Sequence, residues 1–131
     1  MPGDGAALLS RMLPRGPRFR RGTSLISATQ RGEQGRVRVV FEGEIDLTNV
    51  AKVITPVRRA VRAAAPGYLD VDLNRVTFVD CSGIGALMTC HARASAAGCR
   101  LTVINAQPMV QRVLGLTNTM ETLCGVAPPA A

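Results

Sequence analysis

The sequence predicts an α/β protein in which helices pack on a mixed β-sheet. Stretches with the two-residue period of a strand alternate with stretches of helical period, and glycine or proline marks several boundaries between them. Hydrophobic residues make up 47% of the chain but aromatic residues only 3%, which predicts a core of Val, Ile, Leu and Ala. At 131 residues the chain fits one domain.

Strand-like residues open the predicted domain. Residues 24–29 alternate loosely between apolar and polar side chains, and residues 37–45 form a longer strand-like stretch. Between them, residues 31–35 carry the glycine and polar side chains typical of a turn. We therefore expect these segments to pair as an antiparallel hairpin.

From Leu47 the hydrophobic period changes to that of an amphipathic helix. Thr48 is its expected N-cap, and Pro66-Gly67 ends the segment. Pro56 does not fit the pattern, because a proline inside a helix removes one backbone hydrogen bond and costs about 3 kcal/mol. We expect either a kink at Pro56 or a helix that restarts with Thr55 as its cap.

The second half of the chain continues the alternation of strands and helices. Asn74-Arg75 is expected to form a turn between two short strands, and Gly98 is expected to end the second helix. The resulting order, β-β-α-β-(β)-α-β-α, favours a mixed sheet with helices packed on it. The predicted elements are strands over residues 68–73, 76–79 and 101–104, a helix whose apolar face carries Ile84, Leu87, Met88 and His91, and a last helix opened by Pro108.

Most of the net charge of +7 lies in the first residues of the chain. Residues 1–21 contain five arginines and one acidic residue, Asp4. We expect residues 1–22 to form a basic, disordered leader and residues 126–131 a disordered tail, which leaves one domain over residues 23–125. A basic leader could contact phosphates, but no groove-reading motif accompanies it, so no specific nucleic-acid binding is predicted.

Cysteine spacing and hydropathy indicate a reduced, cytoplasmic protein. The four cysteines form no CxxC pair and match no common zinc pattern, so neither a metal nor a disulfide framework is predicted. No run approaches the roughly 18 apolar residues that a membrane helix needs, and the first residues do not resemble a signal peptide. We therefore expect neither membrane insertion nor secretion.

The segment Asp80-Cys81-Ser82-Gly83-Ile84-Gly85 stands where a predicted strand ends and a helix begins. Ser82 is expected near the N-cap, where free backbone N–H groups and the positive end of the helix dipole face outward. An anion attached to Ser82 would be partly stabilised there, and the two glycines would leave the hydroxyl unshielded. The same residues also fit a serine that only caps the helix, followed by a tight turn.

No catalytic motif accompanies this segment, so we predict no enzyme activity and no cofactor. A hydrolase elbow of the G-x-S-x-G type fails because Asp80 occupies its first glycine position. A cysteine phosphatase loop built on Cys81 would need an arginine where Leu87 stands, and no phosphate-binding loop of the G-x-x-x-x-G-K-[ST] type exists. His91, the sole histidine, lacks the partners of a triad or metal site.

Two segments resemble signatures of the bacterial anti-sigma factor antagonists of the STAS family. Residues 80–85 resemble the pattern D-[ST/x]-S-G-[LI]-G/R, and Gly43-Glu44-Ile45-Asp46-Leu47-Thr48 is similar to the G-E-[LI]-D segment. The similarity covers about residues 24–125, with the two motifs in the expected order. It implies the STAS fold, with a mixed central sheet of about four to five strands and helices packed mainly on one face.

The resemblance also implies a function and a site. Ser82 corresponds to the serine that an anti-sigma factor with serine kinase activity phosphorylates, and the unphosphorylated chain would bind that anti-sigma factor and free a sigma factor. A metal-dependent serine phosphatase would regenerate the active form. The sequence leaves open whether the chain forms a homodimer. Asp80 matches the acid before the serine and Asp46 an acid on a neighbouring loop. The expected partner-binding residues are Asp46, Thr48, Asp80, Cys81, Ser82, Gly83, Ile84 and Gly85.

Cys81 departs from the commonest form of the motif, where a second hydroxyl residue is frequent. Ser82 is therefore the only phosphorylation candidate within it. We expect Cys81 to be a small buried packing residue, and Cys90, Cys99 and Cys124 to lie in the core. Two alternatives remain open: a STAS-like sensor or scaffold regulated by a ligand or by oxidation at Cys81, and a nucleic-acid binder that uses the basic leader.

Overall fold

A computed structural model describes residues 25–125, so the predicted leader and tail lie outside the described residues. The α/β class is confirmed. In chain order the elements are β1 (Leu25–Arg31), β2 (Arg36–Ile45), α2 (Ala51–Ala64), β3 (Tyr68–Val79), α3 (Cys81–Ala96), β4 (Arg100–Ile104), α4 (Pro108–Leu116) and α5 (Met120–Cys124).

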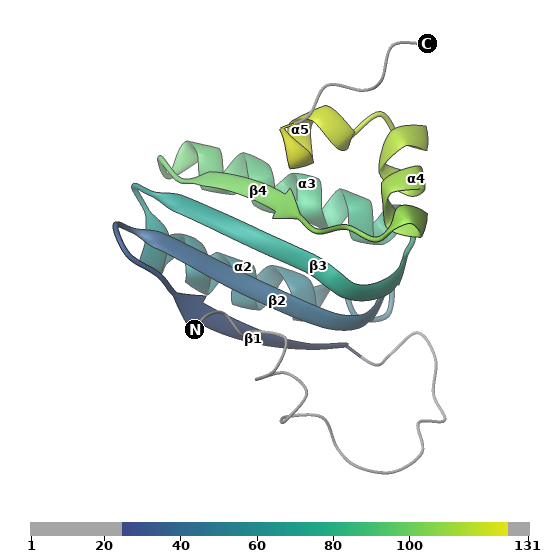
Figure 1. The fold of residues 1–131 in the computed structure, drawn as a ribbon, viewed down its shortest axis with the longest axis horizontal. Helices are drawn as coiled ribbons and strands as arrows, with labels where there is room; N and C mark the ends of the chain where they lie inside the picture. Colours follow the sequence, from purple (N-terminus) through teal and green to yellow (C-terminus); the bar gives the residue numbers. More distant parts are fainter. Residues whose placement is uncertain (1–24, 126–131) are drawn as a thin grey trace.

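The four strands form one mixed sheet in the order β1-β2-β3-β4 (Figure 1). The predicted hairpin is present, since β1 pairs antiparallel with β2. Strands β2, β3 and β4 are parallel neighbours, and each is followed in the chain by a helix. The carboxyl ends of these three strands therefore meet at one edge of the sheet, on the right in Figure 1.

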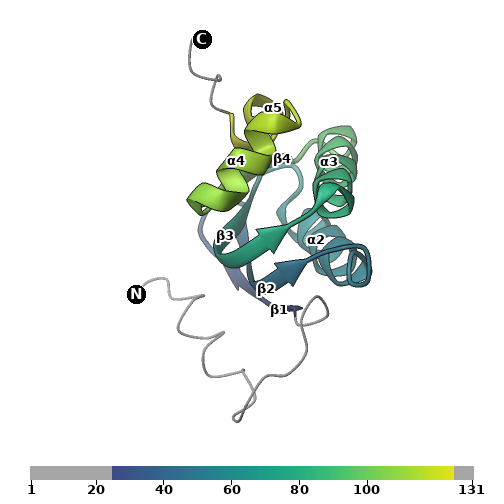
Figure 2. The same cartoon turned by 90° about the vertical axis from the view of Figure 1, so that its right-hand side faces the viewer.

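Helices α2 and α3 lie side by side on one face of the sheet, as Figure 2 shows. Helices α4 and α5 pack against β3 and β4, on the side of the sheet that is farthest from strand β1. The main core fills the space between the sheet and α2 and α3, because alternate residues of each strand point to that side. Its fully buried members include Val39, Phe41, Val57, Val71 and Leu87.

The start of α2 differs from the sequence-based expectation. The helix begins at Ala51 with Val50 as N-cap, so Thr48 is not its cap. A turn over residues 47–50 precedes it and joins it through the bond from Ile54 N to Val50 O at 3.0 Å. The helix then runs through Pro56 without a restart. Thr48 instead bonds to the preceding acid, as described below.

Strand β3 also differs, because it is one element of 12 residues and not two short strands with a turn. The pairing with β2 includes Asp72 and Arg75 on either side of Asn74, and Leu73 and Val76 are both fully buried. The local irregularity is absorbed by two shifts in the β2–β3 register, one of them between Val40 and Glu42. Burial of apolar residues on both sides thus outweighs the turn preference of Asn74.

Candidate functional site at the carboxyl edge

The N-terminus of α3 is built by Asp80. Its carboxylate accepts a hydrogen bond from the backbone N–H of Gly83 at 3.0 Å and so caps the helix. Its own backbone N–H donates to the carbonyl of Ile45 at 3.1 Å, which joins this junction to the end of β2. Asp80 and Asp46 therefore follow neighbouring strand ends at the carboxyl edge of the sheet.

Ser82 is the second residue of α3, and its hydroxyl takes no part in capping. The side chain is half-buried, and among residues 25–125 its hydroxyl has no hydrogen-bond partner. A serine at the N-cap usually satisfies a free backbone N–H group, but here Asp80 occupies the N-cap and does so. The capping interpretation of Ser82 is therefore wrong, and its hydroxyl is available for other chemistry.

The two glycines of the segment have different reasons to be glycine. A Cβ on Gly83 would lie 2.6 Å from Val79 Cγ2 and 2.7 Å from Ile45 Cγ2, so the close packing of α3 on the sheet requires glycine there. A Cβ on Gly85 would meet no atom within 4 Å. Gly85 is exposed, so no contact within the described residues explains a glycine there.

Four of the predicted partner-binding residues divide into two that face the sheet and two that face solvent, a division that the sequence does not predict. Gly83 and Ile84 are buried, and the Ile84 side chain is only 4% exposed, so both support the packing of α3. Cys81 and Gly85 are exposed. The expectation that Cys81 is buried is wrong: it is the first residue of α3, and the inward positions of this turn are taken by Gly83 and Ile84.

The loop after β2 is held in place by its own side chains. Asp46 Oδ1 accepts hydrogen bonds from the backbone N–H of Thr48 at 2.9 Å and from its hydroxyl at 2.6 Å. Asn49 accepts from the backbone N–H of Asp46 at 3.0 Å and donates to the carbonyl of Glu44 at 2.8 Å. Sequence reasoning overlooked Asn49, although an Asp and an Asn three residues apart after a strand are typical of such side-chain turns.

Two exposed apolar side chains flank this loop and the start of α3. Leu47 is 72% exposed and Phe78 is 42% exposed. Because Phe78 pairs in register with Glu44, it lies near the same strand ends that carry Asp46 and Asp80. Exposed apolar side chains next to polar ones are typical of protein interaction sites. Sequence reasoning assigned Leu47 to the start of a helix and Phe78 to a strand, and did not predict their exposure.

The remaining cysteines behave as core residues, as expected for Cys90 and Cys99, which are buried. Burial raises the pKa of Cys90 to about 11 and also raises the pKa of Cys99 and Cys124. Cys124 is half-buried and packs against the core, and all four thiols are free.

Within residues 25–125, no cluster of three His, Cys, Asp or Glu side chains could hold a metal ion. None of the helices in this range is long and apolar enough to cross a membrane.

The mixed sheet, the two helices on one face and the capped α3 together define a STAS-type domain. The chain belongs to the STAS family described as "Mlab, STAS domain", whose model matches residues 27–123. No curated protein sequence matches the chain significantly.

Solved structures share this fold at low sequence identity. An anti-sigma factor antagonist from Mycobacterium paratuberculosis is 22% identical with a TM-score of 0.64, over 76% of this chain and 83% of the other. The anti-sigma factor antagonist SpoIIAA in its unphosphorylated form is 17% identical with a TM-score of 0.61, over 79% and 100%. A sulfate transporter family protein from Wolinella succinogenes is 15% identical with a TM-score of 0.53, over 73% and 77%. The likeness extends to proteins of different roles, so it establishes the STAS fold.

Proposed function

We propose that this chain is an anti-sigma factor antagonist that is switched off by phosphorylation of Ser82. In its unphosphorylated form it binds an anti-sigma factor with serine kinase activity and frees a sigma factor, and a metal-dependent phosphatase reverses the modification. The observation that carries the proposal is the Ser82 hydroxyl in the first turn of α3, which has no hydrogen-bond partner among the described residues and lies at an edge with exposed Leu47 and Phe78. The likeness of the fold to solved anti-sigma factor antagonists supports it.

The helix terminus explains how a phosphate at Ser82 would leave the fold intact. The first turn of α3 contains no acidic residue, and the free N–H groups and the helix dipole there favour negative charge by about 0.3–1 kcal/mol. Asp80 lies two residues before Ser82 and offsets part of this gain by repulsion. We expect the domain to remain folded after phosphorylation.

The same modification would disrupt binding at this edge. A phosphate adds about −1.5 to −2 charge to a contact that a neutral hydroxyl made before. It would stand near Asp80 and the Asp46 loop, so repulsion and the desolvation of the phosphate both oppose docking. In this proposal the partner contacts Asp46, Thr48, Cys81, Ser82 and Gly85, while Asp80 acts as the cap.

The chain in this account is a kinase substrate and a binding module in the cytoplasm, and it performs no catalysis. A test is to incubate the full chain with the anti-sigma kinase and ATP and to map phosphate by mass spectrometry. We expect one phosphate on Ser82. Ser82→Ala should abolish incorporation, whereas Ser95→Ala, at an exposed serine near the other end of α3, should not change it. Incorporation at another residue, or none, contradicts the proposal.

The exposure of Cys81 favours a second candidate, a STAS-like scaffold regulated by oxidation. An exposed thiol beside Ser82 could change the same surface by forming a sulfenic acid when peroxide is the oxidant. The two candidates separate through single variants. If Cys81→Ser removes the regulation of partner binding while Ser82→Ala leaves it intact, the oxidation mechanism replaces phosphorylation.

A further inference from the structure

The outer face of helices α2 and α3 is strongly basic. Helix α2 has four exposed basic residues and no acidic one, and Arg93 adds an exposed guanidinium from α3. None of these five has an ion-pair partner between residues 25 and 125. The arginines that are paired lie on strands, in the pairs Arg36–Asp70, Arg38–Asp72 and Arg75–Glu42. Of the five basic residues on the helices, Arg58 and Arg93 lie between α2 and α3, whereas Lys52 and Arg59 line a separate hollow between α2 and β1; the remaining one is Arg62.

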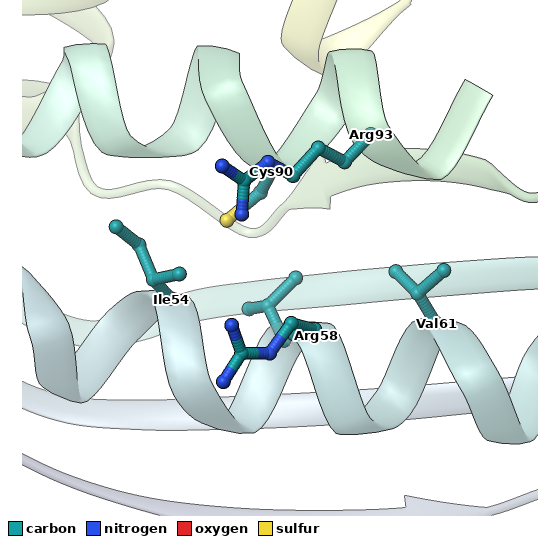
Figure 3. A pocket seen from close by; sticks show the side chains of 6 residues that line it. Ile54, Arg58, Val61, Cys90 and Arg93 are labelled. Atoms are coloured by element: carbon teal, nitrogen blue, oxygen red, sulfur yellow. The ribbon is translucent and has the colours of Figure 1, made fainter. Parts of the chain in front are cut away.

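A small apolar pocket opens between the two helices on this face. It has a volume of about 40 Å³, and the close-up in Figure 3 shows the Cys90 side chain directed from α3 toward α2, with the guanidinium groups of Arg58 and Arg93 nearby. Drug-sized ligands occupy pockets of about 300–1,000 Å³, so this one accepts only the end of a single side chain. The residues that line it are Ile54, Val57, Arg58, Val61, Cys90 and Arg93.

We propose that this helix face is a second docking site, which binds an acidic segment of another protein. One aliphatic side chain of that segment enters the pocket, and carboxylates on either side of it pair with Arg58 and Arg93. Charge complementarity selects the partner, because the face presents cations that the described part of the chain leaves unpaired. The apolar pocket supplies the anchor that gives such a contact specificity.

The shape and composition of the face argue against other anionic partners. Its apolar part is recessed, whereas a protein that docks on a lipid surface needs apolar side chains that project. Neither α2 nor α3 contains Phe, Tyr or Trp, the side chains on which the bases of single-stranded nucleic acid stack most strongly. The chain's own first 21 residues carry five arginines and one acid, so their charge does not complement this face.

This site is distinct from the Ser82 edge and does not rest on the proposed switch. Cys90 and Arg93 follow Ser82 by 8 and 11 residues on the same helix, which corresponds to roughly 12–17 Å along its axis at 1.5 Å per residue. A variant that changes the pocket face therefore leaves the Ser82 hydroxyl in place. The two proposals can fail separately.

The probe for the test is a fluorescent synthetic peptide of glutamate and alanine with one central leucine, titrated against the full chain and followed by anisotropy. We expect binding that weakens about tenfold or more when the leucine is replaced by glycine. The Arg58→Glu/Arg93→Glu variant should weaken binding by about tenfold or more, and Arg100→Glu/Arg112→Glu, at exposed arginines elsewhere, should stay within about twofold. Val61→Ile, which adds one methyl group to the pocket wall, should weaken the leucine peptide but not the glycine peptide.

Three outcomes would overturn the proposal. The first is equal binding of the leucine and glycine peptides, which would show that the face attracts acidic peptides by charge alone and that the pocket takes no part. The second is an equal loss of binding in the Arg100→Glu/Arg112→Glu control. The third is tighter binding of phosphatidylserine vesicles or duplex DNA than of the leucine peptide, lost in the Arg58→Glu/Arg93→Glu variant, which would assign the face to a membrane or to nucleic acid.

Discussion

In the segment of residues 80–85, the residues that face the sheet and those that face solvent have different roles. On the inward side, Asp80 caps α3 and Gly83 and Ile84 fit it against the sheet. On the outward side, the Ser82 hydroxyl has no hydrogen-bond partner among residues 25–125, and Gly85 is exposed with nothing within 4 Å of an added Cβ. Because successive helical residues point about 100° apart, one short segment can serve packing and surface roles at once. Variants on the two sides should therefore separate stability from binding.

Gly83→Ala should have the largest effect on stability. Its methyl group would lie under 3 Å from two β-branched side chains, which have little freedom to move away. Overpacking of this kind costs about 1–3 kcal/mol, and we expect the free energy of unfolding to fall by about 2 kcal/mol in a denaturant titration. An unchanged midpoint would show that α3 does not need this close approach.

Asp80→Ala should have the next largest effect, a loss of about 1 kcal/mol, because it removes the cap of α3. Asp80→Asn is the matched control: it keeps the accepting oxygen but removes the charge, so its stability should stay within about 0.5 kcal/mol of the original chain. Both free energies come from the same denaturant titration. Equal losses in the two variants would show that the charge of Asp80, and not its hydrogen bond, supports the helix.

Gly85→Ala should stabilise the fold and weaken partner binding. A glycine inside a helix costs about 0.5–1 kcal/mol relative to alanine, and the added methyl group meets nothing within 4 Å. Gly115→Ala is the control, since it also adds a methyl group in open space but lies on α4 and outside the segment of residues 80–85. Calorimetric titration with the anti-sigma factor should show a loss of affinity only for Gly85→Ala. Equal affinities would place the partner elsewhere.

The cysteine thiols should show the contrast between buried and exposed positions through their reactivity. Cys81 is exposed, whereas burial raises the pKa of Cys90 to about 11 from its ordinary value of 9.0. A raised thiol pKa keeps Cys90 protonated at pH 8, with about a hundredfold less thiolate than an ordinary cysteine. Iodoacetamide at pH 8 should therefore label Cys81 first, as read by mass spectrometry, and Cys81→Ser should remove the fast phase. Labelling of Cys90 before Cys81 would contradict the structure.

The periodicity of the chain predicts the element order and the mixed sheet, but it does not predict which way a residue at a helix start faces. That direction depends on which residue is the cap. Serine and aspartate are almost equally good caps, so the sequence could not assign the role to Asp80 over Ser82. The burial of Cys81 was mispredicted for the same reason, since moving the helix start by two residues turns a side chain from the sheet to solvent.

Other differences arise from contacts between elements that local patterns do not contain. The burial of Leu73 and Val76 in the core outweighs the local preference of Asn74 for a turn. The exposure of Leu47 and Phe78 depends on where β2 and β3 end relative to each other, which only the strand register sets. The two site motifs themselves were recognisable in the sequence, because they are short, contiguous and carried by particular residues.

The most direct test of the central claim is to compare the chain before and after stoichiometric phosphorylation of Ser82. Unfolding and binding of the anti-sigma factor should be measured on the same two samples. We expect the free energy of unfolding to change by less than about 1 kcal/mol, because the helix terminus accommodates the phosphate, while the affinity falls at least about tenfold. An unchanged affinity, or a phosphorylated chain that unfolds, would contradict the assignment of Ser82 to the outward, partner-binding side of the segment.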